Sequence, residues 1–203
     1  MKFANSWPFK MQMVKKSSLF IGRFQPLHIG HLADIKSIIA KDEHCMVAIA
    51  AMNKIGTWRN PLTGDERERI LRETLETESE LDPKGLRQNS YSIHQMSDID
   101  NDEKCVEHVV GSLPPFEKVY SGSKYVREFF IKDGRFEAVP VKMIHGEDGE
   151  RLCSTNIRKK VLKWEDYGKE IHPRTAEILN ELAFRERLVK ITPKPVDVAH
   201  IME

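Results

Sequence analysis

Short apolar runs alternate with amphipathic segments along most of this chain. Continuous apolar runs near 14–21 and 45–51 predict two strands that are buried on both faces. Weaker runs predict three further strands at 90–96, 117–120 and 136–143. Between the strands, apolar residues recur at helical spacing in 28–41, 63–78, 105–110, 125–130 and 152–158. The alternation predicts βαβ units, and hence an α/β fold with a doubly wound, parallel five-stranded sheet and C-terminal helices.

The domain organisation follows from the same pattern. The chain has 203 residues, enough for one domain with a full core. Residues 1–16 are predicted to be an N-terminal extension, and residues 17–165 the main domain. Residues 166–203 are predicted to be a C-terminal helical segment and tail of the same domain, with one amphipathic helix over 175–190. The tail carries an alternating apolar set that would suit addition to a neighbouring chain: Val196, Val198 and Ile201.

One turn concentrates the chemistry of the chain. It lies between the first strand and the first helix and reads Gly22-Arg23-Phe24-Gln25-Pro26-Leu27-His28-Ile29-Gly30-His31. A helix start presents free backbone N–H groups and the positive end of the helix dipole, which together attract anions. His28 and His31 are three residues apart and therefore share one helix face, while Arg23 adds a permanent cation. The combination predicts a site for a polyphosphate.

The composition argues against several kinds of binding partner. The formal net charge is +1, so no overall field would draw the protein to nucleic acid or to an anionic membrane. No apolar run is long enough to cross a bilayer. The three cysteines are scattered and show no CxxC spacing, which argues against a disulfide framework and against a zinc site. A reducing, cytoplasmic location fits this usage.

Four ordered motifs resemble those of one family. They span Gly22 to His31, Asn60 to Arg67, Leu113 to Gly122, and Cys153 to Arg158, which reads C-S-T-N-I-R. Together they resemble the nucleotidyltransferase superfamily of HxGH enzymes, and most resemble the archaeal-type nicotinamide-nucleotide adenylyltransferases. The likeness covers about residues 17–165 and implies a Rossmann-like nucleotidyltransferase fold. It implies an enzyme that moves AMP from ATP to a phosphomonoester and releases pyrophosphate.

The resemblance also implies roles for residues. A substrate phosphate would attack the α-phosphorus of ATP, so the protein positions polyanions and needs no nucleophile of its own. The catalytic set would be His28, His31, Arg23 and Arg158. The ATP-binding set would be Gly22, Phe24, Gln25, Gly30, Ser121, Gly122, Ser154, Thr155 and Ile157. Mg2+ would be bound through the ATP phosphates, without a metal site made by the protein. Ser154 and Thr155 have an alternative reading as an ordinary helix cap, and Arg67 is more simply read as a solvated helix residue.

The acceptor is where the chain departs from the family. The archaeal-type enzymes have a tryptophan that stacks on the nicotinamide ring, and the corresponding residue here is Cys105. Trp58 is predicted to supply the missing aromatic face. The predicted acceptor-binding set is Lys54, Trp58, Asp102, Cys105 and Arg127.

Several functions remain open at this point. The favoured acceptor is nicotinamide mononucleotide, which would yield NAD. Alternatives are adenylyl or cytidylyl transfer to phosphopantetheine or a flavin nucleotide, and a non-enzymatic regulator that binds a nucleotide. A class I aminoacyl-tRNA synthetase fragment is disfavoured because no K-M-S-K-S-like segment is present. Family members usually assemble, so the resemblance allows a homo-oligomer.

Overall fold

The fold is built around a five-stranded, fully parallel sheet. The computed structural model describes residues 17–146 and 149–192. The strands are β1 (Ser17–Gly22), β2 (His44–Ile49), β3 (Tyr91–Gln95), β4 (Lys118–Ser121) and β5 (Glu137–Pro140). Their order is β3-β2-β1-β4-β5, and every neighbouring pair is parallel. The predicted doubly wound sheet is therefore confirmed, and its winding reverses between β1 and β4.

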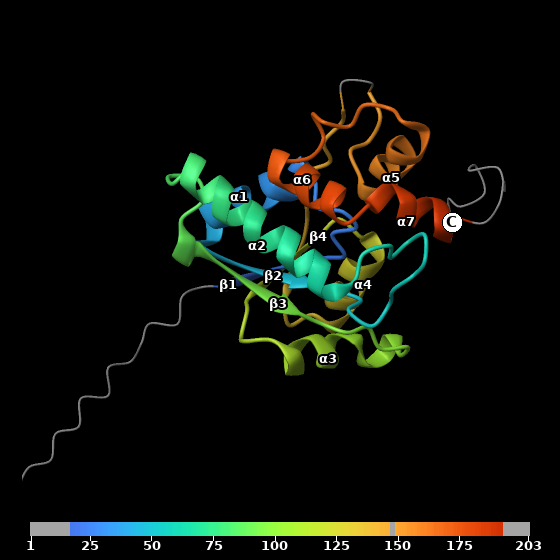
Figure 1. The fold of residues 1–203 in the computed structure, drawn as a ribbon. Helices are drawn as coiled ribbons and strands as arrows, with labels where there is room; N and C mark the ends of the chain where they lie inside the picture. The colour runs from blue at the N-terminus through green and yellow to red at the C-terminus, as the bar shows by residue number, and fades with distance from the viewer. Residues whose placement is uncertain (1–16, 147–148, 193–203) are drawn as a thin grey trace, which may run out of the picture.

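Helices cover both faces of this sheet (Figure 1). They are α1 (Ile29–Asp42), α2 (Gly64–Leu81), α3 (Cys105–Ser112), α4 (Lys124–Asp133), α5 (Ser154–Lys163), α6 (Pro173–Glu181) and α7 (Phe184–Ile191). Two short 3-10 turns, η1 (Gln88–Ser90) and η2 (Asp102–Lys104), precede β3 and α3. None of the helices in the described ranges is long and apolar enough to cross a membrane.

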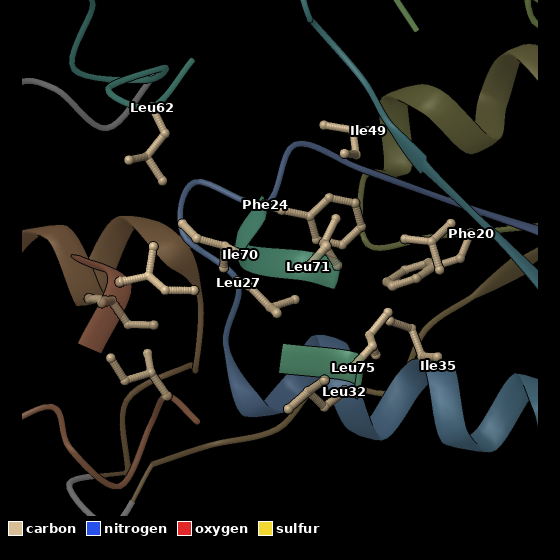
Figure 2. Close-up of a cluster of buried hydrophobic side chains, with 14 of the residues drawn as sticks. Phe20, Phe24, Leu27, Leu32, Ile35, Ile49, Leu62, Ile70, Leu71 and Leu75 are labelled. Atoms are coloured by element: carbon tan, nitrogen blue, oxygen red, sulfur yellow. The ribbon is translucent and has the colours of Figure 1, made fainter. Parts of the chain in front are cut away.

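The side chains of each strand divide between two cores. Along β1, Phe20 enters one core, whereas Leu19 and Ile21 enter the other. This is what alternation requires of a strand covered on both sides. The larger core lies under α1, α2 and α5–α7, and the smaller lies under α3 and α4. Figure 2 shows how Phe24 and Leu27, from the turn after β1, pack in the larger core near side chains of α2.

α2 begins with a capping box, at the start of the segment predicted as a helix over 63–78. The Thr63 hydroxyl accepts a hydrogen bond from the Glu66 backbone N–H at 3.2 Å, and Glu66 accepts one from the Thr63 N–H at 2.8 Å. This reciprocal pair satisfies two N–H groups that a helix start would otherwise leave without partners.

The C-terminal helix prediction is wrong. The segment predicted as one helix over 175–190 is broken into α6 and α7, because Ala183 adopts a left-handed conformation with φ of 48°. The break lets Phe184 and Leu188 of α7 join the same core as Leu179 of α6. The predicted fifth strand also ends at Pro140 rather than at 143, which frees the following residues to border the cavity described below. The predicted extension 1–16 and the tail 193–203 lie outside the described residues.

Candidate nucleotide-binding site

A cavity of about 900 Å³ opens at the carboxyl ends of β1 and β4. It lies where the winding of the sheet reverses, which is the usual ligand position in this architecture. Of the predicted site residues, those lining it are Gly22, Arg23, Phe24, Gln25, His28, Gly30, His31, Asp102, Cys105, Ser121, Gly122, Arg127, Ser154, Thr155 and Arg158. Lys54, Trp58 and Ile157 do not line it.

His28 and His31 cap the first helix reciprocally. The Nδ1 atom of His28 accepts a hydrogen bond from the backbone N–H of His31, and the Nδ1 of His31 accepts one from the N–H of His28, each at 3.3 Å. The two rings stack, with centroids 3.6 Å apart and an interplanar angle of 21°. The pair thus does for α1 what a capping box of Thr and Glu does for α2.

This cap fixes the chemistry of the two rings. An Nδ1 that accepts a hydrogen bond carries no proton, so each neutral ring carries its proton on Nε2. Burial lowers the pKa of His28 to about 3, with a smaller contribution from Arg151. Burial and then His28 lower the pKa of His31 well below its ordinary value. At neutral pH the pair therefore presents two Nε2–H donors without charge of its own.

The buried imidazoles predict an acid dependence of stability. Between pH 6.5 and about 3, the unfolded chain binds a proton at His28 that the folded chain does not, so this contribution to stability is lost as the pH falls. His28→Asn keeps a good helix cap and removes the titration. We expect the free energy of unfolding of the wild type, relative to this variant, to fall by about 1.4 kcal/mol per pH unit below pH 6.5. Urea unfolding at pH 7, 6, 5.5 and 5 measures this; parallel curves for the two proteins would contradict it.

Arg158 enters the cavity from the start of α5. Its side chain is only 4% exposed. Its Nη1 donates to the backbone carbonyl of Gln25 at 2.6 Å, its Nη2 donates to the Thr155 hydroxyl at 3.2 Å, and its Nε has no partner among the described residues. Burial, and then the nearby Arg23, lower the pKa of Arg158 to about 10, so it stays charged at neutral pH. A buried cation with an unused donor is well suited to bind an anion.

The two helix starts are tied together. The Ser154 hydroxyl donates to the carbonyl of Pro26 at 2.9 Å, and Arg158 donates to the neighbouring carbonyl of Gln25. Ser154 is therefore not the cap of α5. The cap position is Cys153, whose side chain makes no capping hydrogen bond. The start of α5 and the histidine pair of α1 consequently border one cavity.

Further cations surround this cavity. The lysines and arginines that line it are Arg23, Arg59, Lys124, Arg127, Lys142, Arg151 and Arg158. Burial and then Arg59 lower the pKa of Arg23, whereas Asp98 raises it. Sequence reasoning missed Arg59, Lys142 and Arg151 as site residues. For Arg59 and Arg151 a signal existed, since they lie one and two residues before recognised motifs.

Some predicted ATP-binding residues stabilise the conformation of the turn between β1 and α1. The Gln25 amide exchanges two hydrogen bonds with the backbone of Leu62, at 3.0 and 2.9 Å. The Phe24 ring packs edge-on against His31, with centroids 4.9 Å apart. A Cβ at Gly22 would meet the Phe24 ring at 2.9 Å, and one at Gly30 would meet the His28 ring at 3.0 Å. The glycines therefore make room for the side chains of the turn itself.

The end of β4 is also held by hydrogen bonds. The Ser121 hydroxyl donates to the carbonyl of Ile21 at 3.4 Å and accepts from the Ser123 N–H at 3.2 Å. Arg127, predicted to contact the acceptor, donates to the Ser121 carbonyl at 2.6 Å while lining the cavity. Ile157, predicted to contact ATP, is fully buried in the larger core.

The predicted acceptor residues are only partly brought together. Cys105 lines the cavity, and burial, then Asp102, raise its pKa. Asp102 accepts a hydrogen bond from the Tyr125 hydroxyl at 2.7 Å. Lys54 instead forms an ion pair with Asp100 at 3.0 Å.

Trp58 is the main correction among the predicted site residues. It packs in the core, 7% exposed, with the Arg158 guanidinium 5.1 Å from its ring centroid. An indole in that position supports the Arg158 guanidinium by a cation–π contact and does not reach the cavity wall, where a substrate ring would lie.

Arg67 corrects a second expectation. It is not solvated but fully buried. Its donors reach the backbone carbonyls of Arg23, Ala50 and Ala51 at 3.0, 2.6 and 3.0 Å. Arg67 therefore joins the carboxyl ends of β1 and β2 rather than contacting a ligand.

Across residues 17–146 and 149–192, no three or more His, Cys, Asp and Glu side chains are grouped so that they could hold a metal ion. The oxygen ligands that Mg2+ prefers would have to come largely from a bound polyphosphate and water.

The fold and this cavity are those of a nucleotidyltransferase-type α/β protein. The chain belongs to the cytidylyltransferase-like family, which it matches over residues 19–160. It is 31% identical to a nicotinamide-nucleotide adenylyltransferase of Archaeoglobus fulgidus, over 86% of this chain and 97% of that protein. It is 33% identical to the protein of the same name from Aeropyrum pernix, over 87% of this chain and 97% of the relative.

Solved structures share the fold. One is a bifunctional NMN adenylyltransferase/ADP ribose pyrophosphatase from Francisella tularensis, complexed with AMP and a manganese ion, with a TM-score of 0.64 and 17% identity. The match covers 87% of this chain but only about half, 52%, of that protein. Another is a nicotinate-nucleotide adenylyltransferase from Vibrio parahaemolyticus, with a TM-score of 0.56 and 15% identity over 82% of this chain and 99% of that one.

Proposed function

We propose that this protein is an adenylyltransferase that moves AMP from ATP to nicotinamide mononucleotide, forming NAD and pyrophosphate. The observation that carries the proposal is the convergence of the His28–His31 pair and Arg158 on one cavity. The relatives named nicotinamide-nucleotide adenylyltransferase support the choice of acceptor, since they match most of this chain at about 30% identity.

The residues have chemistry suited to this transfer. The phosphate of the acceptor attacks the α-phosphorus of ATP, and pyrophosphate leaves on the opposite side. The two Nε2–H groups donate to phosphate oxygens, where negative charge builds up in the transition state. Arg158 and the start of α5 hold the departing β- and γ-phosphates, and Arg23 bridges the two substrates. ATP enters as its Mg2+ complex, in which the ion neutralises phosphate charge.

The proposed partners are small molecules, and the proposed location is the cytoplasm. The net charge of +1 gives no basis for recruiting nucleic acid. Cys45, Cys105 and Cys153 are all free thiols, which suits a reducing cytoplasm. Assembly into a homo-oligomer stays a prediction of the family resemblance.

The test is an acceptor panel. We expect wild-type protein with ATP, Mg2+ and nicotinamide mononucleotide to release pyrophosphate and form NAD in equal amounts. Nicotinate mononucleotide, phosphopantetheine and flavin mononucleotide serve as competing acceptors, and CTP replaces ATP in a parallel series. Equal or faster turnover with phosphopantetheine or flavin mononucleotide would move the proposal to that acceptor. Tight ATP binding with no turnover on the whole panel would instead favour a regulator that binds nucleotide.

A further inference from the structure

Asp34 is a cavity residue that the proposed reaction leaves without a task. It lies on α1 three residues after His31, so both side chains occupy one face of the helix. It lines the same cavity as the histidine pair and Arg158. Neither the family motifs nor the phosphate chemistry call for a carboxyl group here, since a carboxylate repels phosphate.

The surroundings of Asp34 disfavour its charged form. The carboxyl group is half-buried and accepts a hydrogen bond from the backbone N–H of Lys142. No lysine, arginine or histidine within 17–146 and 149–192 forms an ion pair with it. Burial raises the pKa of Asp34 to about 7, although the Lys142 N–H acts in the opposite direction. A carboxyl group held in this way lowers stability, which is typical of a group retained for ligand binding.

The cavity has two ends on either side of the phosphate-binding groups. One end is bordered by residues 97–105, which follow β3 at one edge of the sheet. The other is bordered by residues 140–144, which follow β5 at the opposite edge, and by Asp34. The proposed function assigns the acceptor to the first end, next to Asp102 and Cys105. The nucleoside of the triphosphate then takes the second.

The second end is built like a base pocket. Its apolar lining comes from Pro140, Val141, Met143 and Ile144. Flat apolar contacts combined with very few polar side chains are what a nucleobase needs, because its faces are apolar and its identity lies along one edge. Asp34 supplies a side-chain acceptor at that edge, and the Lys142 N–H holds the carboxyl group in place.

We propose that Asp34 selects the base of the nucleotide by accepting a hydrogen bond from the exocyclic amino group of adenine. One carboxylate oxygen takes the Lys142 N–H, and the other faces the amino group. A base with a carbonyl at the same position, such as hypoxanthine or guanine, places an oxygen against an oxygen and loses the hydrogen bond. This inference rests on the proposed function, because the adenylyl donor defines which nucleotide the pocket must recognise.

The decisive comparison uses ATP and inosine triphosphate, which differ at the 6-position in carrying an amino group or a carbonyl. At pH 8, where most of the Asp34 carboxyl groups are ionised, we expect the wild type to prefer ATP by about 10- to 100-fold in kcat/KM, the range for a hydrogen bond to a charged group. In Asp34→Asn, the amide can turn its NH2 toward the hypoxanthine carbonyl. The preference should therefore fall to within about 3-fold, through a higher KM for ATP and a lower KM for inosine triphosphate.

Control experiments distinguish the role of Asp34 from the proposed reaction. Asp65→Asn, an exposed change on α2, should keep the wild-type preference. An Asp34→Asn preference equal to that of the wild type would overturn the proposal, as would a wild type that uses both nucleotides equally. Calorimetric binding of the two triphosphates without acceptor gives the same ratio independently of turnover. If the wild type binds ATP over inosine triphosphate but transfers nothing, the proposed reaction fails and the role of Asp34 stands. If Asp34→Asn does not fold, Asp34→Ala tested by binding replaces it, and retention of the ATP preference there is equally contradictory.

Discussion

Replacing His31 by alanine is expected to lower kcat for adenylyl transfer by about 10²- to 10³-fold, the loss seen when one preorganised donor to a transition-state oxygen is removed. The His31 ring carries its proton on Nε2, because its Nδ1 accepts the His28 backbone N–H, and the residue lines the cavity. Alanine removes the donor and the stacked partner of His28. Initial rates of pyrophosphate release at saturating ATP and acceptor measure the effect.

Two further variants test whether the lower kcat results from loss of the imidazole donor and not from misfolding. His31→Gln keeps an acceptor for the His28 N–H, as expected at the third position of a capping box, so it should fold normally and still lose most of the rate. His94→Ala, on β3 and outside the cavity lining, should keep the wild-type kcat. If the alanine variant at His31 retained more than a tenth of the wild-type kcat, the imidazole pair would not be part of the catalytic machinery.

Replacing Arg67 by methionine is expected to have the largest effect on stability. Methionine fills much of the same space but removes the Arg67 donors from the backbone carbonyls of Arg23, Ala50 and Ala51. The Ala51 carbonyl keeps the Lys54 N–H as a second donor, so two part-buried carbonyls, of Arg23 and Ala50, lose the Arg67 donor. Each unsatisfied polar group taken from water costs about 1–3 kcal/mol, so the variant should lose at least about 2 kcal/mol. For a chain of this length that lowers the melting temperature by about 4–8 °C.

The matched control for Arg67 lies on the same helix. Arg72 is exposed and forms a surface ion pair with Glu68 one turn earlier, so Arg72→Met should lose less than about 1 kcal/mol. Thermal unfolding followed by circular dichroism compares the two variants. A melting temperature for Arg67→Met as high as that of Arg72→Met would mean that the carbonyls of the β1 and β2 ends find other donors.

Local patterns were enough to predict the sheet and most helices. Apolar runs placed β1 and β2, and helical spacing of apolar residues over 63–78 placed α2. The single helix over 175–190 was wrong because Ala183 has no intrinsic preference for a left-handed conformation. Its conformation results from tertiary packing of α7 against the core, which periodicity within one segment does not report.

The sequence predicted those site residues that lie in motifs typical of phosphate binding. His28, His31 and Arg158 were placed together from their motifs, and the structure brings them to one cavity. Trp58 and Arg67 were harder, because their partners are a guanidinium and backbone carbonyls from distant strands. Asp34 gave no local signal, since an aspartate at one turn of an amphipathic helix usually faces water. Only the tertiary structure shows that this turn borders the cavity.

The central claim is that the start of α1 and the start of α5 hold the same triphosphate. A crystal structure with a non-hydrolysable ATP analogue and Mg2+ tests it most directly. The account predicts phosphate oxygens within hydrogen-bond distance of both Nε2 atoms of the His28–His31 pair and of the Arg158 guanidinium. A triphosphate that contacts only one of these two helix starts, or a nucleotide bound outside the cavity, would contradict it.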